Sequence, residues 1–308
     1  MKYAWIQEHR DSFPVKTMCK VMHVSTSGYY AWRRAKPSPR LQQTRKIRQD
    51  IVKVFEESKQ IYGSYKIADQ MRNRSELETA CRNTVASAMK EMGIKSCVSK
   101  RFKPTTTVTD PSKQPAANVL DQVFEADGPN QKWVTDITYL PTSKGFVYLA
   151  VVLDLFSRKV VGWALSRSLA TSVVSQALRA AIETRRPETS QLLIHSDRGC
   201  QYTSDEYQRV LRTLQITCSM SRTACCYDNA VMERFFWSLK HEWTKFARFT
   251  DIEEARLSVF EYIETFYNRK RIHQTLGYKT PVEFEAKHTS TLALSRKCVF
   301  ISLRIAAS

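Results

Sequence analysis

The residues Trp133-Val134-Thr135-Asp136-Ile137-Thr138-Tyr139-Leu140 decide the fold, because they form a run of β-branched and aromatic side chains. Such a run is typical of a β-strand. Two more apolar strands are predicted at 146–153 and 159–165, and the short turns between the three favour an antiparallel meander.

The sequence that follows alternates between amphipathic helices and short apolar strands. The predicted elements are a helix at 171–186, a strand at 192–195, a helix at 204–214 that Ser204 caps, a strand at 216–220, and helices at 229–245 and 252–267. A meander followed by alternating helix and strand predicts an α/β fold, in which a mixed sheet carries helices on its faces.

The first third of the chain is predicted to be all-α. In residues 1–35 apolar side chains recur at helical intervals, a polar turn covers 24–30, and Ala31-Trp32-Arg33-Arg34 follows. This order fits a helix-turn-helix with Arg33 and Arg34 as DNA contacts, although an ordinary helical hairpin has the same pattern. More helices are predicted between residues 41 and 93.

A polar segment with several prolines separates these helices from the α/β region, and we predict a linker over residues 99–124. Lys100, Arg101 and Lys103 in this linker are candidate contacts for a phosphate backbone. A solvated run of charges is the alternative interpretation.

Composition favours a nucleic-acid partner. Of the 308 residues 43% are hydrophobic, and the net charge is +18, with 23 Lys and Arg against 12 Asp and Glu in residues 1–125. A basic surface of this kind attracts polyanions. The eight cysteines show no CxxC or zinc-finger spacing, no apolar run is long enough for a membrane span, and the charged start is unlike a secretory signal. We therefore expect a cytoplasmic protein with free, mostly buried thiols.

Three acidic residues stand where chemistry is expected. Asp136 lies inside a strand, where an unpaired carboxylate costs several kcal/mol, so it needs a partner such as a metal ion. Asp197 follows the strand 192–195 at the carboxyl end, where α/β sheets bind ligands. Glu233 lies two helical turns before Lys240, so the two share a helix face.

Carboxylates suit Mg²⁺ and Mn²⁺, and two such ions about 3.5–4 Å apart support in-line attack on a phosphodiester. Acids on a strand, a strand end and a nearby helix can converge on such a pair. Each acid taken alone has an ordinary alternative, which is a helix cap or a salt-bridged surface carboxylate.

The spacing of the acids and the words around them carry a resemblance. Thirty-five residues separate Asp197 from Glu233, and sixty separate Asp136 from Asp197, which is similar to the D,D(35)E pattern of retroviral integrases and bacterial insertion-sequence transposases. Over about residues 5–287 the chain resembles the insertion sequence three family of transposases. The matching words are WVTDITY at 133–139, HSDRGCQY at 195–202, YDNAVMERFF at 227–236 and RIHQTLGY at 271–278, with weaker likeness at 24–32 and 62–67.

The resemblance implies a ribonuclease H-like integrase core at 125–287, a helical DNA-binding region at 1–98 and a tail of unknown role at 288–308. It implies that Asp136, Asp197 and Glu233 are catalytic and hold two Mg²⁺ or Mn²⁺ ions, and that the enzyme cleaves and joins DNA strands at insertion-sequence ends. Family members often act as a fusion with an upstream frame. We therefore expect a second-frame product that binds double-stranded DNA as a homo-oligomer, associated with the bacterial nucleoid.

Four more residues are candidate DNA contacts. Lys240 falls where the family carries a basic residue, and it would contact phosphate. His195 and Asn229 are candidate positioning residues, with strand-end packing and a helix cap as their respective alternatives. Tyr227 would stack on or hydrogen-bond to DNA, unless it is a packed loop aromatic.

Two other functions stay open. One is a catalytically silent DNA-binding regulator made from the second frame alone, against which the intact acids argue. The other is a structure-selective nuclease of the same fold, against which the helix-turn-helix pattern argues. Residues 221–226 depart from the family's usual Gly/Asn pattern, and we expect an effect on loop geometry rather than on chemistry.

Overall fold

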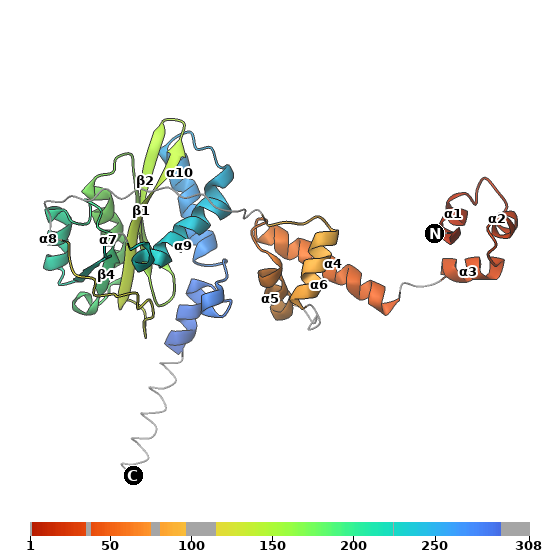
Figure 1. Cartoon of the computed structure of the whole chain (residues 1–308), viewed down its shortest axis with the longest axis horizontal. Helices are drawn as coiled ribbons and strands as arrows, with labels where there is room; N and C mark the ends of the chain where they lie inside the picture. The colour runs from red at the N-terminus through yellow and green to blue at the C-terminus, as the bar shows by residue number, and fades with distance from the viewer. Residues whose placement is uncertain (1, 35–37, 75–80, 97–114, 224, 291–308) are drawn as a thin grey trace, which may run out of the picture.

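The computed structural model describes residues 2–34, 38–74, 81–96, 115–223 and 225–290. They form a small helical unit, a second group of three helices, and an α/β core (Figure 1). None of the helices in these ranges is long and apolar enough to cross a membrane.

The core is built on one five-stranded sheet. Its strands are β1 (Lys132–Thr142), β2 (Gly145–Asp154), β3 (Val160–Ser166), β4 (Leu193–Ser196) and β5 (Thr217–Met220). Their order is β3-β2-β1-β4-β5. The β3–β2 and β2–β1 pairs are antiparallel, and the β1–β4 and β4–β5 pairs are parallel. The predicted meander and mixed sheet are therefore confirmed, and β1 is the central strand.

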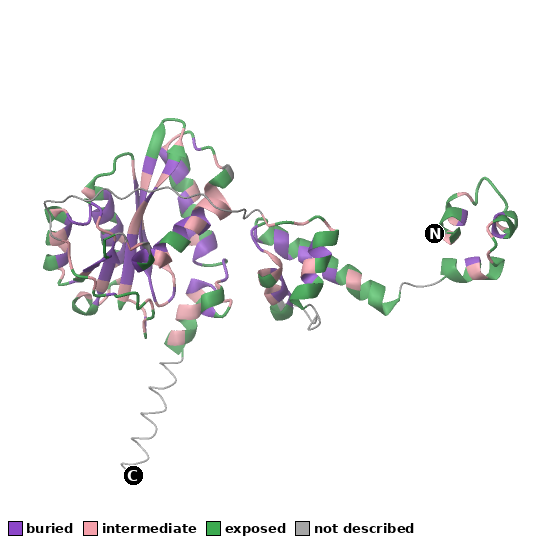
Figure 2. Ribbon diagram, viewed as in Figure 1, coloured by how far each residue is buried: buried purple, intermediate pink, exposed green. Residues whose placement is uncertain are grey.

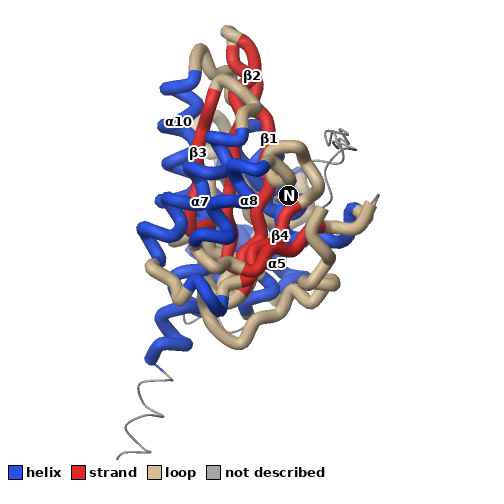
Figure 3. The backbone as a smooth tube through the Cα atoms, turned by 90° about the vertical axis from the view of Figure 1, so that its left-hand side faces the viewer, coloured by secondary structure: helices blue, strands red, loops and turns tan. Residues whose placement is uncertain are grey.

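Helices cover both faces of this sheet (Figure 3). On one face α7 (Thr171–Arg185) packs on β2 and β3, and α8 (Asp205–Thr213) packs on α7. On the other face lie α9 (Ala230–Ser238) and α10 (Ile252–Phe260). Successive side chains of β1 alternate between the two, so Trp133 packs with α7 and Val134 with α9 and α10. Buried residues are concentrated in the sheet and these inner helix faces (Figure 2).

Gly162 explains how closely α7 approaches β3. A Cβ atom at this position would lie 2.4 Å from the carbonyl oxygen of Ala177 and 2.7 Å from the Cβ of Ala181. Only glycine permits this contact without a shift of the helix.

The helices α9 and α10, on the face of the sheet that carries Asp136, each pass into a π-helical segment. α9 continues as a π-helical segment, Leu239–Trp243, and α10 continues as a second one, Glu261–Tyr267. The helices predicted over 229–245 and 252–267 are confirmed, although their second halves are π-helical rather than α-helical. Such widened turns are rare and occur often at functional sites. Short 3₁₀ turns occur at Thr189–Gln191, Cys226–Asn229, Thr244–Phe246 and Gln274–Leu276, and a final helix covers 281–290.

The second group of helices consists of α4 (Pro39–Glu57), α5 (Ser64–Arg74) and α6 (Arg82–Glu91). Their mutual packing buries Ile51, Ile67 and Val85 completely. Ser38 starts α4 by accepting a hydrogen bond from the backbone N–H of Leu41.

The first helical unit contains α1 (Lys2–Glu8), α2 (Val15–Val21) and α3 (Thr26–Arg34) around a small core that includes Tyr29. α3 begins earlier than the predicted turn at 24–30 allows, because Ser25 Oγ accepts a hydrogen bond from Gly28 N at 2.8 Å and opens the helix there.

The predicted linker ends earlier than residue 124. Met220 N donates to the carbonyl of Ala117, and the backbone N–H groups of Val119 and Leu120 both donate to Ser219 Oγ, at 2.9 and 3.0 Å. Residues 115–124 are therefore docked on the end of β5 and belong to the core.

The cysteines that the structure describes are free thiols, as predicted. The prediction that most are buried was wrong, since Cys81 and Cys200 are exposed and two more are partly exposed; these free thiols are Cys19, Cys81, Cys200, Cys218 and Cys225.

Candidate active site

Asp136 lies in the middle of β1 on the face that α9 covers. Its Oδ1 accepts a hydrogen bond from the backbone N–H of Ile137 at 2.7 Å, and the side chain is partly exposed. Burial, followed by the negative charge of Asp197, raises the pKa of Asp136 well above its usual range; Glu233 raises it further and Lys240 lowers it. Asp197, Glu233 and Lys240 are therefore all close enough to Asp136 for their charges to change its pKa.

The parallel pairing of β1 and β4 explains the position of Asp197 next to Asp136. Val134 is in register with His195, so the chain beyond β4 carries Asp197 alongside Asp136. Asp197 Oδ1 accepts a hydrogen bond from Gly199 N at 3.0 Å, which holds the turn after the strand. The site therefore opens at the carboxyl end of β4, as expected for ligand sites of such sheets.

Glu233 and Lys240 approach from α9 and its π-helical continuation. Glu233 is exposed in the first turn of α9, and partial burial raises its pKa. Lys240 Nζ lies 4.6 Å from the ring centroid of Tyr139 on β1, a cation–π contact. Burial lowers the pKa of Lys240 while the charge of Asp136 raises it. Lys240 thus lies near Asp136.

The donor atoms fit a hard cation by their chemistry, since three carboxylates collect negative charge that one lysine offsets. The three carboxylates come from neighbouring elements, but they are not arranged as a complete set of metal ligands. Within the residues described, no three Asp, Glu, His or Cys side chains stand close enough together to hold a metal ion.

Tyr202 is a site residue that the sequence analysis did not single out. It is 1% exposed, its hydroxyl lies 3.2 Å from Thr135 Oγ1, and burial, then the charges of Asp136 and Asp197, raise its pKa. The phenol therefore stays neutral and supports β1 from behind the acids. Its place in the word at 195–202 was the available signal, but sequence does not reveal its contact with Thr135.

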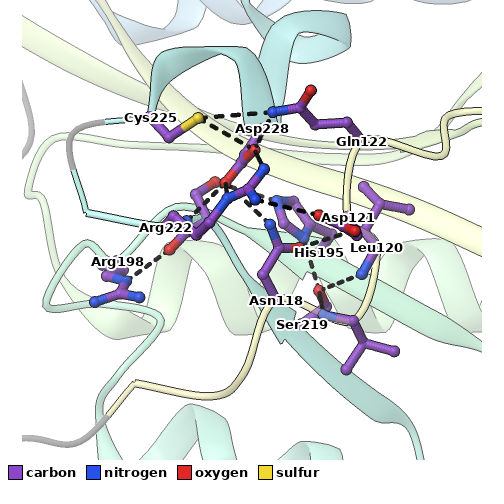
Figure 4. Close-up of polar contacts among 12 residues, drawn as sticks. Asn118, Leu120, Asp121, Gln122, His195, Arg198, Ser219, Arg222, Cys225 and Asp228 are labelled. Carbon is purple, nitrogen blue, oxygen red and sulfur yellow. Dashed lines mark hydrogen bonds and ion pairs between the residues drawn. The ribbon is translucent and has the colours of Figure 1, made fainter.

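Asp228 is a second missed residue, and it anchors the start of α9 (Figure 4). Arg222 donates to its carboxylate from the backbone N at 2.8 Å and from Nη2 at 2.9 Å, and Gln122 Nε2 and Asn118 Nδ2 donate at 2.7 and 3.0 Å. The hydrogen bonds from Arg222 hold the pKa of Asp228 well below its usual range. This buried carboxylate ties residues 118–122, at the start of the core, to the turn that leads into Glu233.

His195 was predicted to contact DNA, and the structure contradicts this. It is fully buried, with Nδ1 2.8 Å from Ser219 Oγ and Nε2 3.1 Å from Ser221 Oγ (Figure 4). Burial lowers its pKa to about 4, so the ring is neutral. The alternative interpretation, strand-end packing, is confirmed.

The other predicted contacts have varied settings. Tyr227 is 71% exposed, so the packed-aromatic alternative was wrong and the ring is open to a partner. Asn229 occupies the N-cap position of α9, but its side chain makes no capping hydrogen bond, and among the described residues its buried Oδ1 has no partner. Arg33 and Arg34 are exposed in the last turn of α3. Residues 100, 101 and 103 lie outside the described ranges.

Comparison with known families places models along most of the chain. An integrase core domain matches residues 126–226, and a second integrase core domain matches 214–281. An HTH-like domain matches 42–102. The HTH-like match therefore falls on α4 to α6, within the helical region predicted at 1–98, whereas the helix-turn-helix pattern itself had been placed in residues 1–35.

Several proteins are similar to the chain. It is 40% identical over 290 residues to the transposase InsF for insertion sequence IS3A of Escherichia coli K12, covering 94% of this chain and 99% of the relative. It is 35% identical over 271 residues to an uncharacterized 31 kDa protein of insertion element IS600 from Shigella sonnei, covering 88% and 98%.

Among solved structures, the HTLV-2 integrase catalytic core domain in complex with magnesium is 19% identical, with a TM-score of 0.41 and coverage of 52% of this chain and 99% of that one. An integrase of the simian T-cell lymphotropic virus intasome matches with a TM-score of 0.44 at 19% identity, covering 57% and 60%. The length and identity of the InsF match settle the assignment, and the chain belongs to the IS3 family of insertion-sequence transposases, with a ribonuclease H-like integrase core.

Proposed function

We propose that this transposase cleaves and joins DNA strands at the ends of its insertion sequence by phosphodiester transesterification, with Asp136, Asp197 and Glu233 as the catalytic acids. The observation that carries the proposal is the parallel register of β1 and β4, which brings Asp197 alongside Asp136, where the charges of Asp197 and Glu233 both raise the pKa of Asp136. Carboxylates that repel one another in a partly closed site are expected where a cation binds.

In this mechanism the acids supply the oxygen ligands for two Mg²⁺ or Mn²⁺ ions. Such ions, when bound, activate an attacking oxygen and stabilise the leaving oxygen of an in-line displacement. Asp136 would orient its oxygens from β1, Asp197 from the turn after β4, and Glu233 would complete the set from α9. Lys240 Nζ, held against Tyr139, supplies a positive charge for a phosphate next to the acids.

DNA recognition falls to the helical regions in this proposal. The match to an HTH-like domain covers α4 to α6, and the exposed Arg33 and Arg34 extend the basic surface. We also propose that the protein assembles on paired ends as a homo-oligomer, acts with the upstream-frame product, and works at the bacterial nucleoid. The division into a helical part, a linker and a core at 125–287 is likewise a proposal, with the core boundary moved to include 115–124.

One assay separates catalysis from silent binding. Purified protein is incubated with labelled element-end DNA and Mg²⁺ or Mn²⁺, beside Asp197→Asn as the matched variant. We expect metal-dependent cleavage or joining that the variant loses while it still binds DNA. Binding by both proteins without cleavage, even when the upstream-frame product is supplied, would instead identify a regulator.

A further inference from the structure

The junction between the HTH-like helices and the core is fixed by Tyr62. Its hydroxyl donates to the carbonyl of Lys270 at 3.0 Å and accepts from the backbone N–H of Ile272 at 3.1 Å. Lys59, next to it, pairs with Glu261 and lies 4.0 Å from the ring centroid of Trp243. The first turn of α5 is therefore held against residues 270–272 of the core.

This junction also determines the position of Lys66. It lies in the first turn of α5, with Nζ 4.9 Å from the ring centroid of Tyr62, and solvent reaches it in part. Because Tyr62 bonds to the residues on both sides of Arg271, the lysine is placed beside that arginine and close to His273.

The positive charge of Arg271 is already paired with a carboxylate. Its Nε and Nη2 donate to Glu242 at 2.6 and 2.5 Å, and Nη2 also donates to Ser238 Oγ at 3.1 Å. Both side chains are nearly buried, at 7% and 5% exposure. The charge of Glu242 is thus already matched by that of Arg271, and the structure shows no ion pair between Glu242 and Lys66.

Arg234 brings a second uncompensated charge to the same place. It is exposed on α9, one turn before Ser238 and so on the same helix face, with its guanidinium 4.5 Å from the Trp237 ring centroid. Within the described part of the chain, neither Arg234 nor Lys66 forms an ion pair with a carboxylate.

The electrostatics agree with this geometry. Burial, followed by the charge of Arg271, lowers the pKa of Lys66 to about 7. Glu242 raises this pKa in part, and Arg234 lowers it further. The pKa of His273 is held well below its usual value by burial and by Arg271, Lys66 and Arg234 among its neighbours. Positive charge is therefore in excess here, and an anion would relieve it.

We propose that Lys66 and Arg234 together bind a phosphate of the DNA backbone, so that one phosphodiester is gripped by α5 of the HTH-like region and by the catalytic helix α9. The proposal rests on the proposed function in that DNA is the ligand. It deepens it by placing a contact one residue from Glu233, where the recognition helices meet the core.

The test measures binding of the full chain to a duplex of arbitrary sequence, in EDTA so that no reaction occurs, across a series of salt concentrations. Lys66→Met and Arg234→Ala are each expected to weaken binding about tenfold and to lower the slope of log K against log salt by about 1. The matched controls are Lys144→Met, an exposed lysine of the turn between β1 and β2, and Arg179→Ala, an exposed arginine of α7 on the opposite face of the sheet from α9.

Stability provides the second readout. Since Lys66 is crowded by Arg271, Lys66→Met is expected to leave the melting temperature unchanged or higher while DNA binding falls. Slopes for Lys66→Met and Arg234→Ala that match those of Lys144→Met and Arg179→Ala would overturn the proposal. Competition by inorganic phosphate beyond that of chloride at equal ionic strength would assign the site to a free anion and overturn it too. Because these measurements need no catalysis, a failure of the cleavage assay leaves their outcome interpretable.

Discussion

Arg271 and Glu242 form a bidentate ion pair in the interior of the core, in which Nε donates to Oε2 at 2.6 Å and Nη2 donates to Oε1 at 2.5 Å. The pair joins the closing segment at 271–278 to the π-helical continuation of α9, the same segment that carries Lys240. Breaking such a pair leaves a buried charge without a partner, which is costly, whereas replacing both members with apolar side chains is tolerated much better.

We therefore expect Glu242→Ala to lower the free energy of unfolding by about 3–5 kcal/mol. The double variant Glu242→Leu with Arg271→Met is expected to lose less than the single variant. Denaturant unfolding of the three proteins measures this. Equal losses for single and double variants would contradict the view that the orphaned Arg271 charge is the main cost.

His195 gives a prediction for acid stability. Its pKa is about 4 in the folded protein and near 6.5 when unfolded, so the folded state favours the neutral ring. Its contribution is fully present above the unfolded pKa, and it is lost as the pH falls from about 6.5 to 4, by up to about 3 kcal/mol. His195→Asn is expected to flatten this part of the curve of stability against pH. An NMR titration that finds a His195 pKa near 6.5 would refute the prediction.

Asp228 is expected to act on catalysis through the start of α9. Asp228→Asn removes the charge that gathers Arg222, Gln122 and Asn118, so the turn before Glu233 loosens. We expect a lower melting temperature. We also expect weaker Mn²⁺ binding, which would appear as a higher half-saturating Mn²⁺ concentration for strand joining. Asp121→Asn is the control, because Asp121 pairs with the same Arg222 at 3.3 Å but is 70% exposed. A Mn²⁺ dependence unchanged by Asp228→Asn would limit the residue to a structural role.

Gly162 is expected to be sensitive to a single methyl group. The overlap with Ala177 and Ala181 predicts that Gly162→Ala destabilises the protein by about 1–3 kcal/mol. Gly63→Ala is the matched control, since a Cβ there would have no heavy atom within 4 Å. Thermal unfolding that ranks the two variants equally would show that α7 adjusts to the extra volume.

Local patterns predicted most of the core. The β-branched run around Asp136, the turns of the meander and the cap at Ser204 each depend on neighbours in sequence, and the structure confirms them. The resemblance of the words around the acids indicated the family. The widened turns after Ser238 and Phe260 escaped prediction because they arise from packing rather than from a local signal.

Contacts between distant segments were also beyond the sequence. Asp228 bonds to residues more than a hundred positions away, and His195 is enclosed by two serines of the β5 region. The polar motif around Asp197 suggested a DNA contact for His195, although its place in β4 between Ser219 and Ser221 makes it a packing residue. The same long-range pairing explains why residues 115–124 were assigned to a linker.

The central claim is that Asp136, Asp197 and Glu233 act as one metal-dependent site. The most direct measurement is the rate of strand joining on element-end DNA in Mn²⁺ for Asp136→Asn, Asp197→Asn and Glu233→Gln, with Glu206→Gln, an exposed acid of α8, as the control. We predict that each of the three loses at least about 100-fold in rate while DNA binding persists, and that the control keeps the parent rate. A near-parental rate in any one of the three would contradict the account.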